Sequence, residues 1–307
     1  PMLSSVAERL YWMARYLERV EDTARLTYAY TQFILDTPRG SEPGWRSLID
    51  IIDGHVNFER RYKNYNERNV CKFLIADMDN MSSIRYSVRA ARENVRTTRD
   101  VLPEECWELV NELYIYVTSN AEKVKARQSR LDFLDYVLAL SAQINGVIGS
   151  SLSHDHAYRF MRMGRNLERA DMTSRVVDVA VMTEMDGNLG EEASTWIWGH
   201  LLKSLSAVTA YRRKVGPLVD ANDVVNFVFN DPNFPRSISY CLSVVRKDSR
   251  ALRNHTQVEK LLLSMSRKLG RFDASKMSAQ KLHRYIDVFQ EQLIKLNLLV
   301  YQSWFSR

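Results

Sequence analysis

Apolar side chains recur at the three- and four-residue spacing of an α-helix over most of this chain. Near the start, one such stripe predicts a helix over residues 4–36. It is formed by Leu10, Met13, Leu17, Val20 and Ala24. The last segment, 278–305, carries a longer stripe of the same kind. That stripe consists of Leu282, Tyr285, Ile286, Phe289, Leu293, Leu296, Val300 and Tyr301. No segment alternates between apolar and polar residues for long, so we expect an all-α protein without a sheet.

Further helices are predicted between these two. They cover residues 44–59, 103–127, 131–152, 156–185, 191–214, 236–253 and 255–270. One more predicted helix is capped by Asn80 or Ser82 and reaches Asp100. Residues 60–69 read as a polar loop, and the clearest breaks lie at 37–40 and 186–188. The chain has only 11 Gly and 7 Pro in 307 residues, and because both residue types break helices, their scarcity also favours an all-α fold.

The chain repeats itself at an offset of 150 residues. Residues 7–26 and 157–176 are identical at nine of twenty positions. Five of the nine matches are charged, namely Arg9/Arg159, Arg15/Arg165, Glu18/Glu168, Arg19/Arg169 and Arg25/Arg175. Core periodicity does not demand matching charges, so the repeat indicates two related halves that each carry a Leu-Glu-Arg element.

A second block repeats in the same order at an offset of 154. Residues 73–96 resemble residues 227–250, and the matches include Asp77/Asp231, Ser83/Ser237 and Tyr86/Tyr240. No low-complexity linker separates the halves. We therefore expect one domain over residues 1–307, a single helical bundle in which 4–152 and 154–305 form halves related by a pseudo-twofold axis.

The repeated charges lie away from the apolar stripe when residues are spaced by roughly 100° around the helix. One interpretation is a solvated face with local pairs such as Glu21–Arg25. Another is a buried ion network of Glu18, Arg19, Glu168 and Arg169. A third is a polar pocket in which arginines bind a carboxylate or phosphate. The candidate binding residues are Arg15, Arg19, Arg25, Arg165, Arg169 and Arg175.

Candidates for acid or base chemistry are Glu18, Glu168, His154 and His156. The two histidines on either side of Asp155 could also ligate a metal. On a helix, however, residues at i and i+2 point to different faces. A polar helix start with Asp155 as its N-cap is a commoner arrangement than a metal site. Di-iron bundles need Glu-x-x-His pairs, and the sequence contains none. P-loop, dinucleotide-binding and zinc-finger spacings are missing as well. The sequence therefore assigns no metal site and leaves the catalytic residues undetermined.

Charge and cysteine usage set broad limits on partners and compartment. The net charge is +6, and the arginines are spread over several helices, so nucleic-acid binding is not expected. The three cysteines form no CxxC pair, and we find neither a secretory signal nor an apolar run of about eighteen residues. We therefore expect a reduced cytoplasmic setting without a membrane. Pro1 before Met2 is expected to be a tag remnant.

Three segments together carry a resemblance to a known family. They are LYWMARYLERVEDTAR at 10–25, RFMRMGRNLERAD at 159–171 and FLIADMDNMSSI at 73–84. The chain resembles the alpha-E family, a bacterial all-helical domain named for its Glu-Arg motif, over essentially its whole length. It departs from the family at Met78 and Met81, where the family tends to have prolines.

The resemblance implies a context more than a reaction. The resemblance implies that the protein is a partner of a circularly permuted ATP-grasp protein, a class that resembles amide ligases. This context implies synthesis or processing of a small peptide or peptide tag. We therefore expect a scaffold or substrate-binding subunit with no cofactor of its own, with ATP and Mg only on the ATP-grasp partner. The alternative is a stand-alone enzyme that uses the doubled Glu/Arg element on a substrate containing a carboxylate or an amide. The expected ligand of the protein is a peptide or a carboxylate.

Overall fold

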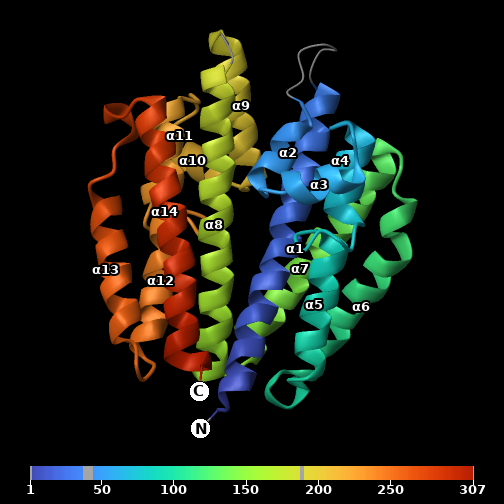
Figure 1. The fold of residues 1–307 in the computed structure, drawn as a ribbon, viewed down its shortest axis with the longest axis vertical. Helices are drawn as coiled ribbons and strands as arrows, with labels where there is room; N and C mark the ends of the chain where they lie inside the picture. The colour runs from blue at the N-terminus through green and yellow to red at the C-terminus, as the bar shows by residue number, and fades with distance from the viewer. Residues whose placement is uncertain (1, 37–43, 187–189, 307) are drawn as a thin grey trace. The chain divides into compact units, whose positions relative to one another are not determined.

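The computed structural model describes residues 2–36, 44–186 and 190–306, and over these ranges it contains fourteen α-helices and no strand (Figure 1). The expected all-α class is confirmed. The predicted breaks at 37–40 and 187–188 lie outside the described residues. By its internal contacts the chain divides into two compact units, Pro1–Arg165 and Asn166–Arg307, and each is described by itself. The pseudo-twofold relation between sequence halves stays a prediction.

Unit 1 consists of seven helices and the first part of an eighth. They are α1 (Ser4–Asp36), α2 (Arg46–Ile51), α3 (His55–Arg61), α4 (Glu67–Ile75), α5 (Ile84–Arg96), α6 (Glu104–Asn120), α7 (Arg127–Ser151) and the start of α8 (His156–Asp186). The predicted stripe of α1 is buried throughout and packs against α5 and α7. The apolar spacing of this helix therefore places it at the centre of its unit.

Unit 2 contains the remainder of α8 and six further helices. They are α9 (Glu191–Ser204), α10 (Val208–Lys214), α11 (Ala221–Asn230), α12 (Ile238–Arg250), α13 (Thr256–Gly270) and α14 (Ala279–Val300), which continues as a π-helical turn over Tyr301–Phe305. One face of α14 completes the core. Its buried residues are Leu282, Ile286, Phe289, Leu293, Leu296 and Val300.

Two of the predicted helices are wrong in the same way, because each is broken by a residue in the left-handed region. The segment 44–59 forms α2 and α3, and Asp53 between them has φ 51°. The segment 191–214 forms α9 and α10, with Ser206 at φ 52°. A single residue at positive φ ends a helix without disturbing the apolar spacing on either side, so periodicity alone does not reveal it.

Two short helices were missed. The supposed loop 60–69 contains the start of α4, where the side chain of Asn66 accepts a hydrogen bond from the backbone N–H of Asn69 at 2.9 Å. No helix was predicted over α11, which Asp220 caps through the N–H of Asp223 at 3.1 Å. Both starts follow the ordinary rule that Asn and Asp satisfy free N–H groups at a helix N-terminus.

The repeated serines are the caps of α5 and α12. Ser83 Oγ accepts from the N–H of Tyr86 at 3.0 Å, and Ser237 Oγ accepts from Tyr240 at 3.1 Å. The predicted cap at Asn80 or Ser82 is therefore wrong, and α5 ends at Arg96 rather than at residue 100. Asn80 instead accepts from the N–H of Ser82 at 3.0 Å within the preceding turn.

The backbones of α1 and α8 approach closely in unit 1. A Cβ atom at Gly164 would lie 2.4 Å from the carbonyl oxygen of Tyr11. In the first repeat the equivalent position is Ala14, so glycine here is not dictated by the repeat. Only a residue without a side chain permits this contact, which brings the first repeat beside the start of the second.

Helix α4 is tied to α7 by charges at their N-terminal ends. Glu67 accepts from Arg127 Nε at 2.9 Å and from Arg130 Nη1 at 3.0 Å. Arg130 is buried and also donates to Thr31 Oγ1 at 3.2 Å. Burial raises the pKa of Glu67, but the hydrogen bonds from the two arginines outweigh it and hold the pKa below its ordinary value.

Among the described residues, α7 is the one helix long and apolar enough to cross a membrane by length and composition. It carries Asp132 and Asp135, and its apolar face contributes Leu134, Val137 and Ile144 to the core. The core helix of a globular protein passes the same test, so the finding is weak support for a membrane span.

Gly164→Ala should destabilise the protein, because the added methyl group overlaps the Tyr11 carbonyl and forces α1 and α8 apart. We expect the free energy of unfolding to fall by about 1–3 kcal/mol in chemical denaturation. Gly146→Ala is the matched control, since a Cβ there meets nothing within 4 Å and α7 should gain up to about 1 kcal/mol. Equal effects at both positions would contradict the close approach.

Glu67→Gln should lower the free energy of unfolding at neutral pH, with the difference from the unmodified protein shrinking under acid. A carboxyl group with a depressed pKa stabilises the fold above its unfolded-state pKa, near 4.3, and loses that effect as the pH falls through the folded value. Denaturation at pH 7, 5 and 3 measures this. Glu104→Gln, at the exposed first position of α6, is the control and should change the free energy of unfolding little. A constant difference between Glu67→Gln and the unmodified protein across these pH values would contradict the depressed pKa of Glu67.

Candidate functional site

The Arg of each Leu-Glu-Arg element makes the same contact in its own unit. Arg19 Nη1 donates to the carbonyl of Met81 at 3.4 Å, and Arg169 Nη1 donates to the carbonyl of Pro235 at 3.4 Å. Both distances are long for such a bond. Met81 and Pro235 lie two residues before the capping serines, so the two repeated sequence blocks meet in each unit. These two arginines therefore position the turn before a helix.

A second pair of repeated arginines forms local ion pairs. Arg25 Nη2 lies 2.7 Å from Glu21 Oε1, and Arg175 Nε lies 2.9 Å from Asp171 Oδ1. Glu21 also accepts from Asn145 at 3.1 Å. The predicted Glu21–Arg25 pair is confirmed. Such i,i+4 pairs contribute a few tenths of a kcal/mol to a helix, roughly 0.2–0.5.

Glu18 has a different environment. Its side chain is fully buried, and its Oε2 lies 3.5 Å from Nε of Arg165 on α8, within unit 1. The glutamate of the first repeat thus pairs with an arginine of the second. A buried carboxylate needs such a partner, because an isolated charge in the interior is strongly disfavoured.

This pair lies in the wall of a hollow in unit 1. The cavity volume is about 50 Å³, and the empty space reaches about 440 Å³ when the part open to solvent is included. Its lining comes from α1, α7 and α8 and consists of Ala14, Leu17, Glu18, Asn145, Ile148, Gly149, Tyr158, Met161, Arg162 and Arg165. Apolar side chains make up most of the lining, which also includes two guanidinium groups, one carboxylate and the amide of Asn145.

The remaining charged candidates lie elsewhere. Arg15 is buried beside two rings, 5.1 Å from the Trp12 centroid and 5.8 Å from that of Tyr11. Glu168 and Arg169 are buried in unit 2, whereas Arg19 is only half-buried. The expected burial holds for Glu18, Glu168 and Arg169, and a joint network of all four side chains stays a prediction.

The cluster at 154–156 forms the start of α8. All three residues are exposed, and Asp155 Oδ1 accepts from the N–H of Ala157 at 3.0 Å, which is a capping contact. His154 Nε2 lies 3.1 Å from the carbonyl oxygen of Gly149, and its ring stacks on Tyr158 with centroids 3.9 Å apart. His154 therefore borders the hollow through two lining residues.

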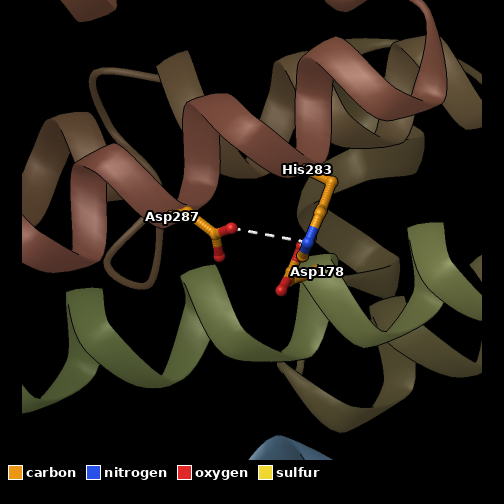
Figure 2. Close-up of side chains that lie close together, drawn as sticks. All are labelled: Asp178, His283 and Asp287. Atoms are coloured by element: carbon orange, nitrogen blue, oxygen red, sulfur yellow. Dashed lines mark hydrogen bonds and ion pairs between the residues drawn. The ribbon is translucent and has the colours of Figure 1, made fainter.

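A second group of polar side chains, not found from the sequence, lies in unit 2 (Figure 2). Asp178 of α8 faces His283 and Asp287 of α14, and their ligand atoms all lie within 4.8 Å of one another. His283 Nδ1 is 2.6 Å from Asp178 Oδ1, and Nε2 is 3.4 Å from Asp287 Oδ2. The hydrogen bond to Asp178 raises the pKa of His283, while burial raises the pKa of Asp178. The i,i+4 spacing of His283 and Asp287 was the available signal.

Sequence reasoning also missed part of the hollow. Arg162, whose guanidinium lies 5.3 Å from the Tyr158 ring centroid, and Asn145 line it alongside Glu18 and Arg165. Neither of these two residues repeats in the other half, so a search guided by the repeat passed over them. Arg162 lies on α8, which carries the second Leu-Glu-Arg element, and Asn145 lies on α7.

Comparison with known proteins finds relatives that are described as uncharacterized. The chain is 27% identical over 274 residues to uncharacterized proteins of Mycobacterium bovis and of two Mycobacterium tuberculosis strains. The match covers 80% of this chain but 30% of each relative, so the chain spans less than a third of their length. No solved structure matches.

One family profile covers nearly the whole chain. It matches residues 2–305 and is described as a predicted alpha-helical domain with a conserved ER motif. The repeated Glu18-Arg19 and Glu168-Arg169 pairs and the all-helical fold agree with that description. On this match, the chain belongs to the Alpha-E family.

Proposed function

We propose that this protein is a binding subunit that holds the carboxylate end of a small peptide or amino-acid-like molecule in the hollow of unit 1 and works with a circularly permuted ATP-grasp amide ligase. The observation that carries the proposal is the pairing of Glu18 with Arg165 in the wall of a solvent-connected hollow that also presents Arg162. Polar groups that converge beside apolar side chains are typical of ligand sites.

The size of the hollow favours an end group over a whole molecule. A buried water needs about 10–15 Å³ of such volume, so about 50 Å³ accommodates roughly three to five water-sized groups. A carboxylate and the atom that bears it fill that space. The rest of the ligand would lie in the part of the hollow that is open to solvent.

The charge of the lining favours an anionic group. Two arginines and one glutamate leave one net positive charge, and guanidinium groups bind carboxylates through paired hydrogen bonds. Glu18 also lines the hollow, and a carboxylate there would accept a hydrogen bond from an amide or ammonium group of the ligand. A peptide C-terminus or an amino-acid head group offers both features.

The alternative is a stand-alone enzyme in which Glu18 is an acid or base and His154 assists. Its support is the position of His154, in contact with Gly149 and Tyr158 at the border of the hollow. The lining includes no serine, cysteine, threonine or lysine that could act as a nucleophile. Binding is therefore the function that this lining serves best.

The relatives favour a role alongside another domain. Their matched region makes up 30% of each protein, so in them an alpha-E-like segment accompanies more than twice its own length of other sequence. A domain that binds a peptide end and acts beside a ligase is consistent with this arrangement. The ligase partner itself follows from the family resemblance.

Arg165→Gln should weaken binding of N-acetyl-leucine or of Gly-Leu, used as probes for a peptide C-terminus, by about tenfold or more. The loss of one charge-assisted hydrogen bond corresponds to about 1.5–3 kcal/mol. Titration followed by NMR measures both affinities. Arg162→Gln should act in the same direction, whereas Arg89→Gln, an exposed arginine on α5, should leave the affinity unchanged.

The probes should perturb signals of Tyr158 and Met161 in the unmodified protein. If they bind with equal affinity to the Arg165→Gln and Arg89→Gln variants, or perturb only residues outside the lining, the hollow is not the carboxylate site. Leucinamide, which lacks the carboxylate, serves as the ligand control and should bind at least about tenfold more weakly.

The purified chain should not form amide bonds or hydrolyse ATP by itself, but should form a stable complex with the ATP-grasp protein encoded nearest to its gene. Size-exclusion chromatography with light scattering tests the complex, and a phosphate-release assay with the peptide probe tests ligation with and without this chain. ATP turnover by this chain alone, abolished by Glu18→Gln, would favour the enzyme alternative. Lack of a complex at about 10 μM of each protein would remove the partner from the proposal.

A further inference from the structure

We propose that His283 and Asp287 of α14, oriented by Asp178 of α8, form a binding site for a divalent transition-metal ion of the zinc type. The site lies wholly in unit 2 and shares no residue with the hollow of unit 1. The sequence assigned no metal ligand, and nothing in the proposed binding function requires one.

The spacing on α14 presents two ligands on one helical face. His283 and Asp287 are four residues apart, which places their side chains one turn above each other. Two metal ligands at i and i+4 on one helix recur in zinc sites of proteins. Both side chains point toward α8 in the close-up (Figure 2).

Asp178 fixes which nitrogen is available. Its Oδ1 lies 2.6 Å from Nδ1 of His283, so Nδ1 carries a proton in the neutral imidazole and Nε2 is then the nitrogen with a lone pair. Metal-binding histidines almost always donate their second ring N–H to such an acceptor, and this contact makes the ligating nitrogen more basic. Asp178 therefore acts as a positioning residue.

The distance on the other side of the ring matches two ligands of one ion. Nε2 of His283 lies 3.4 Å from Oδ2 of Asp287. In a tetrahedral zinc site with bond lengths of about 2.0–2.2 Å, two ligand atoms are about 3.4 Å apart. An ion can thus occupy the position between them with only small side-chain rotations.

The site is reachable and negatively charged. The side chains of His283 and Asp287 are 35% and 52% exposed, whereas Asp178 is 16% exposed. The two carboxylates of Asp178 and Asp287 attract a dication, and the nearby Arg175 is paired with Asp171 at 2.9 Å. With two protein ligands, the exposed side leaves the remaining coordination positions to water or to an anionic group.

The competing explanation is an imidazolium held between two carboxylates, with no metal. Both explanations use the same contacts, but they differ in what Nε2 does. In the ion pair, Nε2 carries a proton that points at Asp287. In the metal site, Nε2 is deprotonated and bonded to the ion, so the ¹⁵N chemical shift of that nitrogen separates the two.

The test is Zn²⁺ titration of the full chain, followed by histidine ¹⁵N NMR and by competition with a chromophoric chelator. We expect one equivalent of Zn²⁺ to shift Nε2 of His283 into the range of a metal-bound nitrogen. His283→Ala and Asp287→Ala should each reduce affinity by at least about a hundredfold, and Asp178→Asn by about 10–100-fold. His255→Ala, at a half-buried histidine outside the cluster and outside the candidate residues, is the control and should bind as the unmodified protein does.

Three results would overturn the proposal. They are no shift of the His283 ring nitrogens at 1 mM Zn²⁺, unchanged affinity in His283→Ala, or equal loss in His255→Ala. The NMR measurement uses the unmodified protein, so it decides the question even if a variant fails to fold. Full affinity in Asp178→Asn would show that the ion binds without the orienting carboxylate and would refute that part.

Discussion

The buried carboxylate of Glu18 is the constraint on which unit 1 depends. It lies on the central helix of its unit, surrounded by apolar residues, and it requires a positive partner. Arg165 supplies that partner at 3.5 Å, and the approach of α8 that brings it there needs a glycine at 164. The polar wall of the hollow therefore results from helix packing and charge pairing together. This explains how an otherwise ordinary bundle core comes to include the hollow that we propose as a carboxylate site.

The doubled Leu-Glu-Arg element divides its roles by residue. Its arginines, Arg19 and Arg169, hold the turns before α5 and α12 in their respective units, and this is a structural role. The glutamate of the first copy faces a hollow, and its partner comes from the second copy. Identical residues in a repeat thus do not imply identical functions, because the flanking helices decide what each side chain meets.

The sequence predicted the helical class and the first helix closely, because apolar spacing over thirty residues leaves little choice. It failed where single residues decide the chain path. Asp53 and Ser206 adopt positive φ and break helices whose periodicity continues, and Ser83 caps α5 one residue beyond the expected cap. Of the candidate site, Glu18 and Arg165 were found through the repeat. Arg162 and the Asp178–His283 contact depend on helices meeting in space, which spacing along one helix does not encode.

The central claim is that the Glu18–Arg165 pair holds the arginine in position for a carboxylate ligand. A double-mutant cycle on ligand affinity, with Glu18→Gln, Arg165→Gln and the double variant titrated with N-acetyl-leucine, measures this most directly. The account predicts that both single variants bind weakly and that the double variant is little weaker than Arg165→Gln alone, since the two residues act together. Independent, additive effects, or a Glu18→Gln variant that binds as the unmodified protein does, would contradict it.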